Sequence, residues 1–266
     1  MKKIRIILVG KKSFIAKYIN KYLKNKISIH HVSLEKFLNM KTESIKKFKF
    51  LCNCTINQKY KSNKYLLKND LDFKIIKKIS KIKIKYIFLS SRKIYKNGKN
   101  LYENNKKQPI ENYAKNKLIT EKFIKQTIPK KFIILRVSNI IAPPIKNKRK
   151  VTINFIDNFF DYISSDKVIK YNNYFKDFLS MEQFTFIFFQ ILKKDIIGTY
   201  NVSLGKKVYI RELIRWLTKN KDHNFIPLKK FKNNDSFYLN NNKLTKKLGI
   251  SILKRDLKNY CLRIKV

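Results

Sequence analysis

The sequence predicts an α/β protein with a doubly wound parallel sheet and a small C-terminal lobe, and three observations lead to this prediction. Short apolar runs alternate with runs of helical spacing through the first half of the chain. Gly10 and the polar residues Ser91 and Asn139 stand at or just after the ends of apolar runs, where open α/β sheets bind ligands. Beyond residue 140 the alternation loosens. We therefore expect one domain over residues 1–140 and a smaller mixed α/β lobe over 141–266, packed on it.

The first strand and the turn after it have the pattern of a phosphate-binding loop. Ile4–Val9 is almost continuously apolar, as in a strand that is buried on both faces of a parallel sheet. Gly10 ends the run, and a helix follows at once, so the N–H groups of its first turn would face an anion. Gly10, Ser13 and Ala16 stand where a dinucleotide fingerprint has three glycines. The match is incomplete, and an ordinary tight turn is the alternative interpretation.

The second strand, Ile27–Val32, ends in His30-His31, about 20 residues after the glycine loop. An NAD-preferring fold usually has an acidic residue at this place for the ribose hydroxyls. Glu35 is the nearest acid, and two histidines among lysines suit a 2′-phosphate at least as well. Both NAD and NADP therefore stay open. No carboxylate or cysteine cluster accompanies the histidines, so we expect no metal site.

The same patterns predict the remaining elements. In the first domain we expect strands at Phe48–Cys52, Tyr86–Ser91 and Phe132–Val137, and helices over Lys64–Lys81 and from Tyr113 onward. In the second part we expect the helices Thr152–Ile163, Glu182–Lys193 and Ile210–Leu217, the strand Thr199–Val202, and a short helix closed by Gly249.

Tyr113 and Lys117 are one helical turn apart and would lie on the same face of their helix. The spacing alone carries little weight, because Tyr-x-x-x-Lys occurs at five places in this lysine-rich sequence and chance predicts about three. Only the pair Tyr113/Lys117 has a strand ending in Ser90-Ser91 before it and a helix-period run after it. The context therefore selects this pair.

The charge of the chain is extreme but evenly spread. A net charge of +46 would ordinarily indicate a nucleic-acid or acidic-membrane partner. The lysines are scattered through every segment and accompany many Ile, Asn, Phe and Tyr residues, a preference that A/T-rich codons also produce. The 44% hydrophobic content indicates a packed globule. We expect neither a specific nucleic-acid partner nor a membrane partner.

Cysteine usage and the apolar runs indicate the compartment. Cys52, Cys54 and Cys261 lack zinc-type spacing; the first two are interpreted as small buried residues, and all three fit a reducing cytoplasm. The apolar stretch Ile6–Val9 is too short for a secretory signal, and Phe184–Leu192 is far below the length of a membrane span. These features favour a cytoplasmic protein.

Six ordered motifs occur at consistent spacing along nearly the whole chain. They are Gly10-x-x-Ser13-Phe-Ile-Ala16, Phe88-Leu-Ser-Ser91-x-x-Ile-Tyr95, Tyr113-x-x-x-Lys117, Leu135-Arg136-x-x-Asn139, Lys176-Asp177-Phe178 and Gly198-Thr-Tyr-Asn-Val202. Together they resemble the motifs of the extended short-chain dehydrogenase/reductase family, the NAD(P)-dependent epimerases, dehydratases and reductases of nucleotide sugars. The resemblance implies a Rossmann-like dinucleotide-binding domain and a C-terminal substrate-binding lobe.

The resemblance implies a catalytic set of Ser91, Tyr113 and Lys117. Tyr113 would give or take the proton of a sugar hydroxyl or ketone, although a free tyrosine has a pKa of about 10, too high for a base at neutral pH. Lys117 would supply the positive charge that favours the phenolate and would hold the nicotinamide ribose. Ser91 would hydrogen-bond the same substrate oxygen.

The resemblance also implies the residues that contact ligands. The cofactor, NAD or NADP, would lie along Gly10, Ser13, Phe14, Ile15, His31, Cys54, Thr55, Asn69, Ser90, Tyr113, Lys117 and Ser138. The nucleotide sugar would contact Ser91, Arg92, Asn139 and Lys176. Lys176 replaces an arginine of the motif, which keeps the charge but loses the bidentate fork. A structural role is the alternative for several of these residues: strand end, turn cap, or exposed surface side chain.

The leading hypothesis is an NAD(P)-dependent oxidoreductase or epimerase of nucleotide-linked sugars, of the 4-keto sugar reductase or 4-epimerase type, serving polysaccharide biosynthesis. Dehydratases of the family carry an Asp-Glu pair directly after the catalytic hydroxyl, and Arg92-Lys93 at these positions argues against dehydration. A homodimer is expected by analogy only. The alternative is a catalytically idle NAD(P)-binding sensor or scaffold of the same fold, because the glycine fingerprint is thinned. A nucleic-acid-binding protein is a third hypothesis, which rests on the charge alone.

Overall fold

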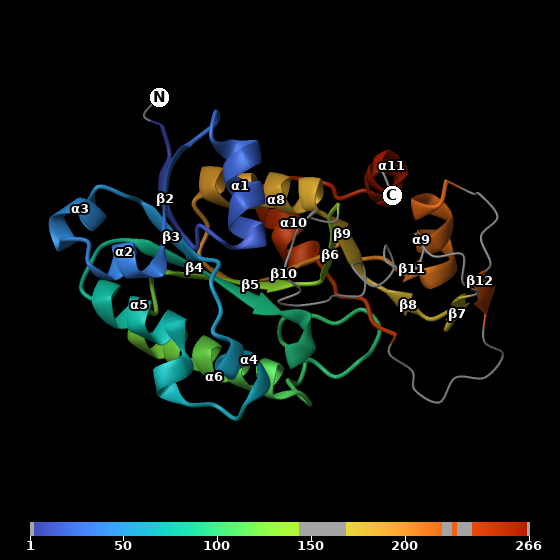
Figure 1. Ribbon diagram of the computed structural model, residues 1–266, viewed down its shortest axis with the longest axis horizontal. Helices are drawn as coiled ribbons and strands as arrows, with labels where there is room; N and C mark the ends of the chain where they lie inside the picture. The colour runs from blue at the N-terminus through green and yellow to red at the C-terminus, as the bar shows by residue number, and fades with distance from the viewer. Residues whose placement is uncertain (1–2, 144–168, 220–224, 228–235, 265–266) are drawn as a thin grey trace.

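The computed structural model describes residues 3–143, 169–219, 225–227 and 236–264. Its centre is a six-stranded sheet in the order β10-β5-β4-β3-β1-β2 (Figure 1). Its strands are β1 (Arg5–Val9), β2 (Ser28–Val32), β3 (Phe50–Asn53), β4 (Lys85–Ser91), β5 (Phe132–Val137) and β10 (Gly198–Val202). Every neighbouring pair is parallel. The predicted doubly wound parallel sheet is confirmed.

The central strands are apolar throughout because both faces of the sheet are covered. In β1, Ile6 and Leu8 belong to one hydrophobic core, whereas Ile7 and Val9 belong to a second core on the opposite face. All four side chains are fully buried. Side chains alternate between the faces of a strand, so two covered faces give a continuous apolar run instead of an alternating one.

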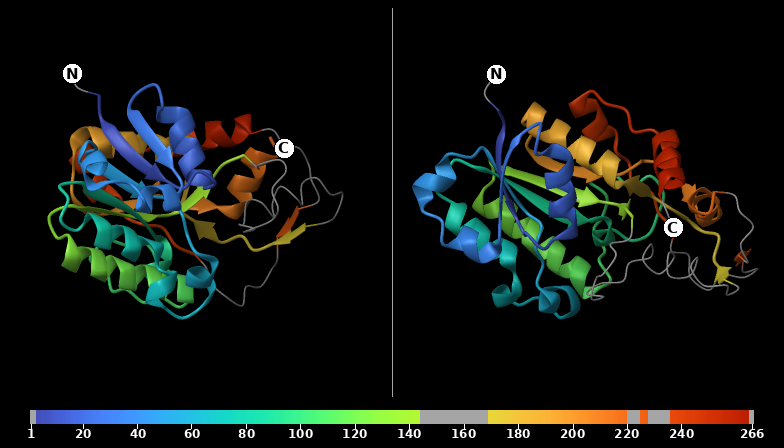
Figure 2. Two further views of the ribbon diagram at one scale, coloured as in Figure 1. Left: turned by 60° about the vertical axis from the view of Figure 1, so that its left-hand side comes forward. Right: turned by 45° about the horizontal axis from the view of Figure 1, so that its top comes forward.

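Helices form a layer on each face of the sheet (Figures 1 and 2). One layer contains α1 (Phe14–Leu23), α8 (Met181–Lys194) and α10 (Asn242–Leu248), and the other contains α4 (Gln58–Ser62), α5 (Leu71–Ile79) and α6 (Asn112–Thr127). The short helices α2 (Leu34–Leu38) and α3 (Thr42–Lys46) connect β2 to β3. Phe188 of α8 packs in the first core, and Ile75 of α5 and Ile124 of α6 pack in the second.

A smaller region of short strands and helices extends beyond the sheet. Its strands form three pairs: β6 (Asn139–Ile141) with β9 (Phe178–Ser180), β8 (Phe175–Lys176) with β11 (Val208–Tyr209), and β7 (Ile169–Tyr171) with β12 (Phe225–Pro227). The helices α9 (Ile210–Leu217) and α11 (Lys254–Arg263) lie in the same region (Figure 1). Because β6 follows β5 almost directly, this region begins at the carboxyl end of the central strands.

The predicted helix over Lys64–Lys81 is shorter than expected. A single 3-10 turn, η1 (Leu67–Asn69), comes first, and α5 begins only at Leu71. Asp70 caps the helix, since its side chain accepts a hydrogen bond from the Phe73 N–H at 3.0 Å. An aspartate is favoured at such a cap and disfavoured in a helix interior, because its carboxylate competes for backbone N–H groups.

The C-terminal half confirms α9 and the helix closed by Gly249, which has φ +67°. β10 and α8, which both lie beyond residue 140, belong to the central sheet and its helical layer. Residues 141–266 therefore contribute to both parts of the molecule. The predicted helix Thr152–Ile163 lies outside the described residues.

Among the described residues, none of the helices has the length and apolar character that crossing a membrane requires. Within the same ranges, no group of three or more His, Cys, Asp or Glu side chains is arranged to hold a metal ion.

Candidate active site

Gly10 ends β1 in a conformation that favours glycine. Its φ is +119°, and a Cβ at this position would lie 2.9 Å from the Thr55 Cγ2. The Gly10 N–H donates to the Val32 carbonyl at 2.8 Å, and the Gly10 carbonyl accepts from the Ser13 N–H at 2.8 Å. The turn therefore joins the ends of β1 and β2 and lies against the loop after β3. This is the close approach that only a glycine permits.

The N-terminus of α1 follows this turn directly. Ser13 is its N-cap, and the Ser13 hydroxyl accepts from the Ala16 N–H at 3.5 Å. Phe14 and Ile15 form the start of the helix and pack partly buried against the first core. The N–H groups of a first helical turn have no intrahelical acceptors and attract anions. The predicted pyrophosphate position is therefore built from a glycine turn and a capped helix start.

The end of β2 carries the two predicted histidines. His30 lies beside Phe48, with 5.6 Å between ring centroids. Burial lowers the pKa of His30, and the nearby charges of Lys36 and Lys11 lower it further. The His31 Nε2 is buried and makes no hydrogen bond within the described part of the chain. Lys11 and Lys36, and not the histidines, therefore make this edge of the sheet positive.

A chain of hydrogen bonds orders the loop after β3. Asn53 is 3% exposed, and its Oδ1 accepts from both the Thr55 N–H at 2.9 Å and the Thr55 hydroxyl at 2.6 Å. The Asn53 Nδ2 donates to the Asp72 Oδ1 at 2.8 Å, and the same carboxylate oxygen accepts from the Tyr86 hydroxyl. Thr55 lies against Gly10, so the network reaches from the glycine turn to the start of α5.

Cys54 occupies the middle of that loop. Its Sγ lies 3.9 Å from the Cys52 Sγ, and neither residue forms a disulfide. Cys52 is fully buried, which raises the pKa of its thiol well above the ordinary value. The interpretation as a small buried residue is confirmed for Cys52, whereas Cys54 is half-buried at the sheet edge.

Tyr113 and Lys117 lie one turn apart at the start of α6. Lys117 is only 5% exposed, and its Nζ lies 4.3 Å from the centroid of the Phe88 ring in β4 and 6.0 Å from the centroid of the Tyr113 ring. A cation above an aromatic face is stabilised by the ring quadrupole. Tyr113 itself is half-buried. The structure therefore brings the predicted tyrosine and lysine together beside the strand that ends in Ser91.

Ser91 ends β4 and caps the 3-10 turn η2 (Arg92–Ile94), because its Oγ accepts from the Lys93 N–H at 3.2 Å. The Ser90 hydroxyl donates to the Glu121 Oε1 at 2.6 Å. Ser91 is half-buried, whereas Ser90 is 4% exposed. A contact of Ser90 with a cofactor stays a prediction, and its side chain is already engaged within the protein.

Arg92, like Ser90, has a side chain that already makes contacts within the protein. It is 9% exposed, and its guanidinium lies 3.8 Å from the centroid of the Phe237 ring. Its NH1 donates to the Asn97 Oδ1 at 2.7 Å. In this structure the side chain of Arg92 therefore stabilises the loop after β4, and its predicted contact with substrate is untested.

Three predicted cofactor residues carry buried polar atoms that have no hydrogen-bond partner among the described residues. These atoms are the His31 Nε2, the Asn69 Nδ2 and the Ser138 Oγ. His31 is in β2, Asn69 precedes α5 and Ser138 follows β5, so all three come from the carboxyl side of the sheet. Buried polar groups are normally paired, so each such atom calls for an explanation.

The predicted substrate residues Asn139 and Lys176 lie at the start of the smaller region. Asn139 begins β6, and Lys176 in β8 has its Nζ 4.7 Å from the centroid of the Tyr174 ring. Both residues are half-buried. They come from separate strands near the carboxyl end of β5, as the prediction requires, although their contact with a diphosphate is untested.

Asp177 joins three segments of the smaller region. It is fully buried and accepts from the N–H groups of Leu204 at 2.9 Å, Gly205 at 3.2 Å and Leu239 at 3.1 Å. Burial raises the pKa of Asp177 to about 7, although these hydrogen bonds oppose the shift. Asp177 is therefore a structural centre of the motif that contains Lys176.

The sequence interpretation missed a buried ion pair behind the site. Arg136 in β5 and Glu121 in α6 bond at 2.7 Å, with side chains 2% and 1% exposed. Arg136 also donates to the Tyr95 hydroxyl at 2.7 Å, and that hydroxyl donates to the Asn201 Oδ1 at 2.9 Å. The network fixes α6 to β5 and β10. The available signal was a glutamate on the helix that carries Tyr113, in a chain with only 17 acidic residues.

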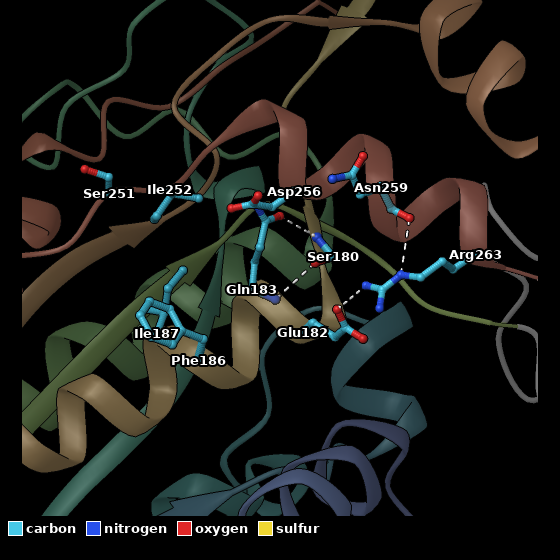
Figure 3. Close-up of a pocket in the computed structure, with 10 residues that line it drawn as sticks. All are labelled: Ser180, Glu182, Gln183, Phe186, Ile187, Ser251, Ile252, Asp256, Asn259 and Arg263. Carbon is cyan, nitrogen blue, oxygen red and sulfur yellow. Dashed lines mark hydrogen bonds and ion pairs between the residues drawn. The ribbon is translucent and has the colours of Figure 1, made fainter.

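A cavity of about 680 Å³ lies elsewhere, between α8 and α11 on the α1 side of the sheet (Figure 3). It is lined by Ser180, Glu182, Gln183, Phe186, Ile187, Ser251, Ile252, Asp256, Asn259 and Arg263. Gln183 bonds to Ser180 and to the Leu253 carbonyl, and Arg263 pairs with Glu182 at 2.6 Å. The cavity contains none of the predicted site residues.

Solved structures resemble the whole chain although the sequences have diverged. A UDP-N-acetylglucosamine 4-epimerase from Methanobrevibacter ruminantium matches with a TM-score of 0.80 and 17% identity, over 98% of this chain and 97% of that one. A UDP-glucose 4-epimerase from Thermotoga maritima has a TM-score of 0.74 and 14% identity, over 97% and 96% of the chains. A UDP-glucuronic acid 4-epimerase from Bacillus cereus, in complex with NAD, has a TM-score of 0.75 and 16% identity, over 98% and 97%.

No protein-family model matches the sequence, and no curated protein does. The likeness is therefore one of fold. The chain has the Rossmann-like fold that these nucleotide-sugar epimerases have.

Proposed function

We propose that this chain is an NAD(P)-dependent oxidoreductase or epimerase that acts on a nucleotide-linked sugar, of the 4-keto sugar reductase or 4-epimerase type. The observation that carries this proposal is the set of buried polar atoms on His31, Asn69 and Ser138 that have no partner among the described residues. They lie at the carboxyl edge of the sheet, where Tyr113 and Lys117 also lie. An unpaired buried polar group costs free energy. A ligand that supplied partners at this edge would remove that cost.

The residues at this edge fit a dinucleotide. The Gly10 turn leaves space that a Cβ would fill, and the start of α1 follows it. Gly10 and the first turn of α1 would hold the pyrophosphate, Thr55 and Asn69 would lie along the cofactor, and Lys117 would hold the nicotinamide ribose. The bound cofactor would supply hydride transfer to or from a sugar carbon.

The side chains of this chain would handle the proton and the orientation of the sugar. Tyr113 would donate a proton to the sugar oxygen or accept one from it, and the Lys117 ammonium would lie beside it. Ser91 would hydrogen-bond the same oxygen and thereby fix the reacting carbon. The Lys117 ammonium is buried beside Tyr113 and Phe88, where its charge is screened less than in water.

A nucleotide sugar is the substrate class that the fold comparison supports. The matched structure from Methanobrevibacter ruminantium is a complex with UDP-N-acetylmuramic acid. In this chain, Asn139 and Lys176 would contact the diphosphate of such a substrate. Arg92-Lys93 in place of an Asp-Glu pair argues against a dehydratase. A homodimer is proposed by analogy alone, and light scattering would test it.

The experiment combines the purified protein with NAD(P) and a panel of nucleotide hexoses, and separately with NAD(P)H and nucleotide 4-keto sugars. We expect epimerised or reduced sugar, detected by NMR, and a loss of turnover of about a hundredfold or more in Tyr113→Phe. Full activity in that variant would contradict the role of Tyr113.

The alternative function is an idle NAD(P)-binding sensor or scaffold. The Ser13 side chain at the place of a motif glycine favours it, since this hydroxyl occupies the helix cap. That alternative predicts a rise in melting temperature with NAD(P) and no turnover of any sugar in the panel.

A further inference from the structure

Asp72 is a second acidic residue at the start of α5, and it lies under the candidate site. It is 4% exposed, and its Oδ1 accepts hydrogen bonds from the Asn53 Nδ2 at 2.8 Å and from the Tyr86 hydroxyl. Asn53 holds Thr55 through three further hydrogen bonds, and Thr55 closes the space beside Gly10. One carboxylate therefore supports Asn53 and Thr55 in the loop after β3, which packs against the Gly10 turn.

Asp72 also lies within electrostatic range of Lys117. Burial raises the pKa of Asp72, and the charge of Lys117 is the strongest influence in the opposite direction. Several other titratable groups interact with Asp72, namely Asp70 before α5, Tyr60 in α4, Tyr65 before η1, Tyr86 in β4 and Cys52 in β3. Of all these groups, Lys117 alone carries a positive charge.

A carboxylate is costly at such a place. Moving a carboxylate charge out of water is unfavourable unless the charge is paired and hydrogen-bonded. An apolar side chain of similar size would satisfy packing in this core. It would remove the acceptor of the Tyr86 hydroxyl, and it would leave the Asn53 Nδ2 only its 3.4 Å hydrogen bond to the Thr55 carbonyl. We explain the buried acid by its hydrogen bonds, because Asp72 holds Asn53 and the Tyr86 hydroxyl in position.

We propose that Asp72 is a positioning residue, which fixes the Asn53–Thr55 loop against the Gly10 turn and places a negative charge near Lys117. The inference rests on the proposed function, because the loop and Lys117 act on a reaction only if a dinucleotide binds at this edge. Asp72 touches neither cofactor nor substrate in this account. It acts through Asn53 and Lys117.

Two substitutions separate the hydrogen bonds from the charge. Asp72→Asn retains the size and one carbonyl oxygen that accepts from Asn53, but it removes the charge. Asp72→Ala removes both. We expect Asp72→Ala to weaken NAD(P) binding by about tenfold, because it leaves a buried donor unpaired beside the cofactor loop. We expect Asp72→Asn to bind NAD(P) nearly as the wild type does.

The charge has its own readout. Asp72→Asn removes a carboxylate charge that interacts with Lys117, so the positive charge beside the reacting oxygen increases. The ascending limb of kcat/KM against pH should therefore move to lower pH in Asp72→Asn. A residue with a purely structural role would lower stability without moving this limb.

Thr120→Val is the matched control. Thr120 is fully buried in the same core, and its Oγ1 bonds to the Asp70 Oδ2 at 2.6 Å and to the Tyr60 hydroxyl at 2.7 Å, but it has no link to the loop. This variant should lower the melting temperature while it leaves the NAD(P) dissociation constant and the pH profile unchanged.

The outcomes are distinguishable. If calorimetry detects no binding of NAD(P) to the wild type, the proposed function fails and the inference fails with it. A second outcome is that the wild type binds NAD(P) and Asp72→Ala has the same NAD(P) dissociation constant as the wild type or as Thr120→Val. In that case the inference is overturned and the proposed function stands. An unmoved pH profile in Asp72→Asn would overturn the charge role of Asp72.

Discussion

At the scale of single residues, Lys117 is the side chain whose burial is hardest to explain without function. A lysine with 5% exposure, over the ring of Phe88, loses most of its hydration. We expect Lys117→Met to stay folded, because the replacement is apolar and similar in length. Turnover at neutral pH should fall by about a hundredfold, since the site loses the positive charge that lies beside Tyr113. Lys115→Met, on the exposed side of the same helix, is the control and should be fully active.

Gly10 allows a test of the turn itself. Gly10→Ala places a Cβ 2.9 Å from the Thr55 Cγ2 at a φ of +119°. We expect a loss of stability of about 1–3 kcal/mol and a clear loss of NAD(P) affinity. Gly249→Ala is the matched control, because its φ is +67° but no atom lies within 4 Å of the added Cβ. It should lose stability without any loss of affinity, and equal losses of affinity in both variants would contradict the account.

Asp177 predicts a pH dependence of folding. Its pKa in the folded protein is about 7, above the ordinary value of 3.8, so the folded state binds the proton more tightly than the unfolded state. The contribution of Asp177 to stability is therefore fully present below about pH 4 and is lost as the pH rises through about 7. Urea unfolding across this range should show a smaller fall of stability with pH in Asp177→Asn than in the wild type. An identical slope in both proteins would contradict the prediction.

At the scale of elements, the sequence patterns succeeded where both faces of an element are defined by apolar residues. β1 is the clearest example, since Ile6–Val9 are all buried and alternate between two cores. The start of α5 was misplaced because the apolar stripe continues upstream through Leu67, whereas the helix begins only after the Asp70 cap. A hydrophobic period does not show where a cap interrupts it.

The position of β10 illustrates a second limit. Thr199–Val202 was recognised as a strand, but its pairing with β5 is a long-range contact that no local pattern specifies. Glu121 and Arg136 were invisible as a pair for the same reason, because they meet only after α6 packs against β5. The candidate residues at strand ends were predictable. The buried acids Asp72 and Glu121, which support them, were not.

The Glu121–Arg136 pair makes a prediction for the packing of α6. Removing one partner leaves a buried charge unpaired, so Glu121→Ala or Arg136→Met alone should cost about 3–5 kcal/mol of unfolding free energy. The double variant should cost less than the sum of the two, because neither charge remains. Urea unfolding of all four proteins gives the coupling energy. Additive losses would show that the pair does not fix α6 to β5.

At the scale of the whole molecule, the fold gathers side chains from five separate segments on one side of the sheet. Gly10 lies in the turn after β1, Thr55 in the loop after β3 and Ser91 at the end of β4. Tyr113 lies at the start of α6, and Asn139 at the start of β6. The chain has a net charge of +46, and its lysines are spread through the whole sequence instead of forming one basic block. We expect any binding of DNA or RNA to be weak, equal for all sequences and lost at moderate salt. Tight, sequence-specific binding would contradict that expectation.

The central claim is that the Tyr113 edge of the sheet carries out hydride chemistry on a nucleotide sugar. The most direct measurement follows deuterium from NAD(P)H labelled on the nicotinamide, mixed with the protein and a nucleotide 4-keto sugar. We expect deuterium on the reacting carbon of the sugar, with transfer slowed by about a hundredfold or more in Tyr113→Phe and by about a hundredfold in Lys117→Met. NAD(P)H that binds but retains all of its deuterium with every sugar tested would contradict the claim.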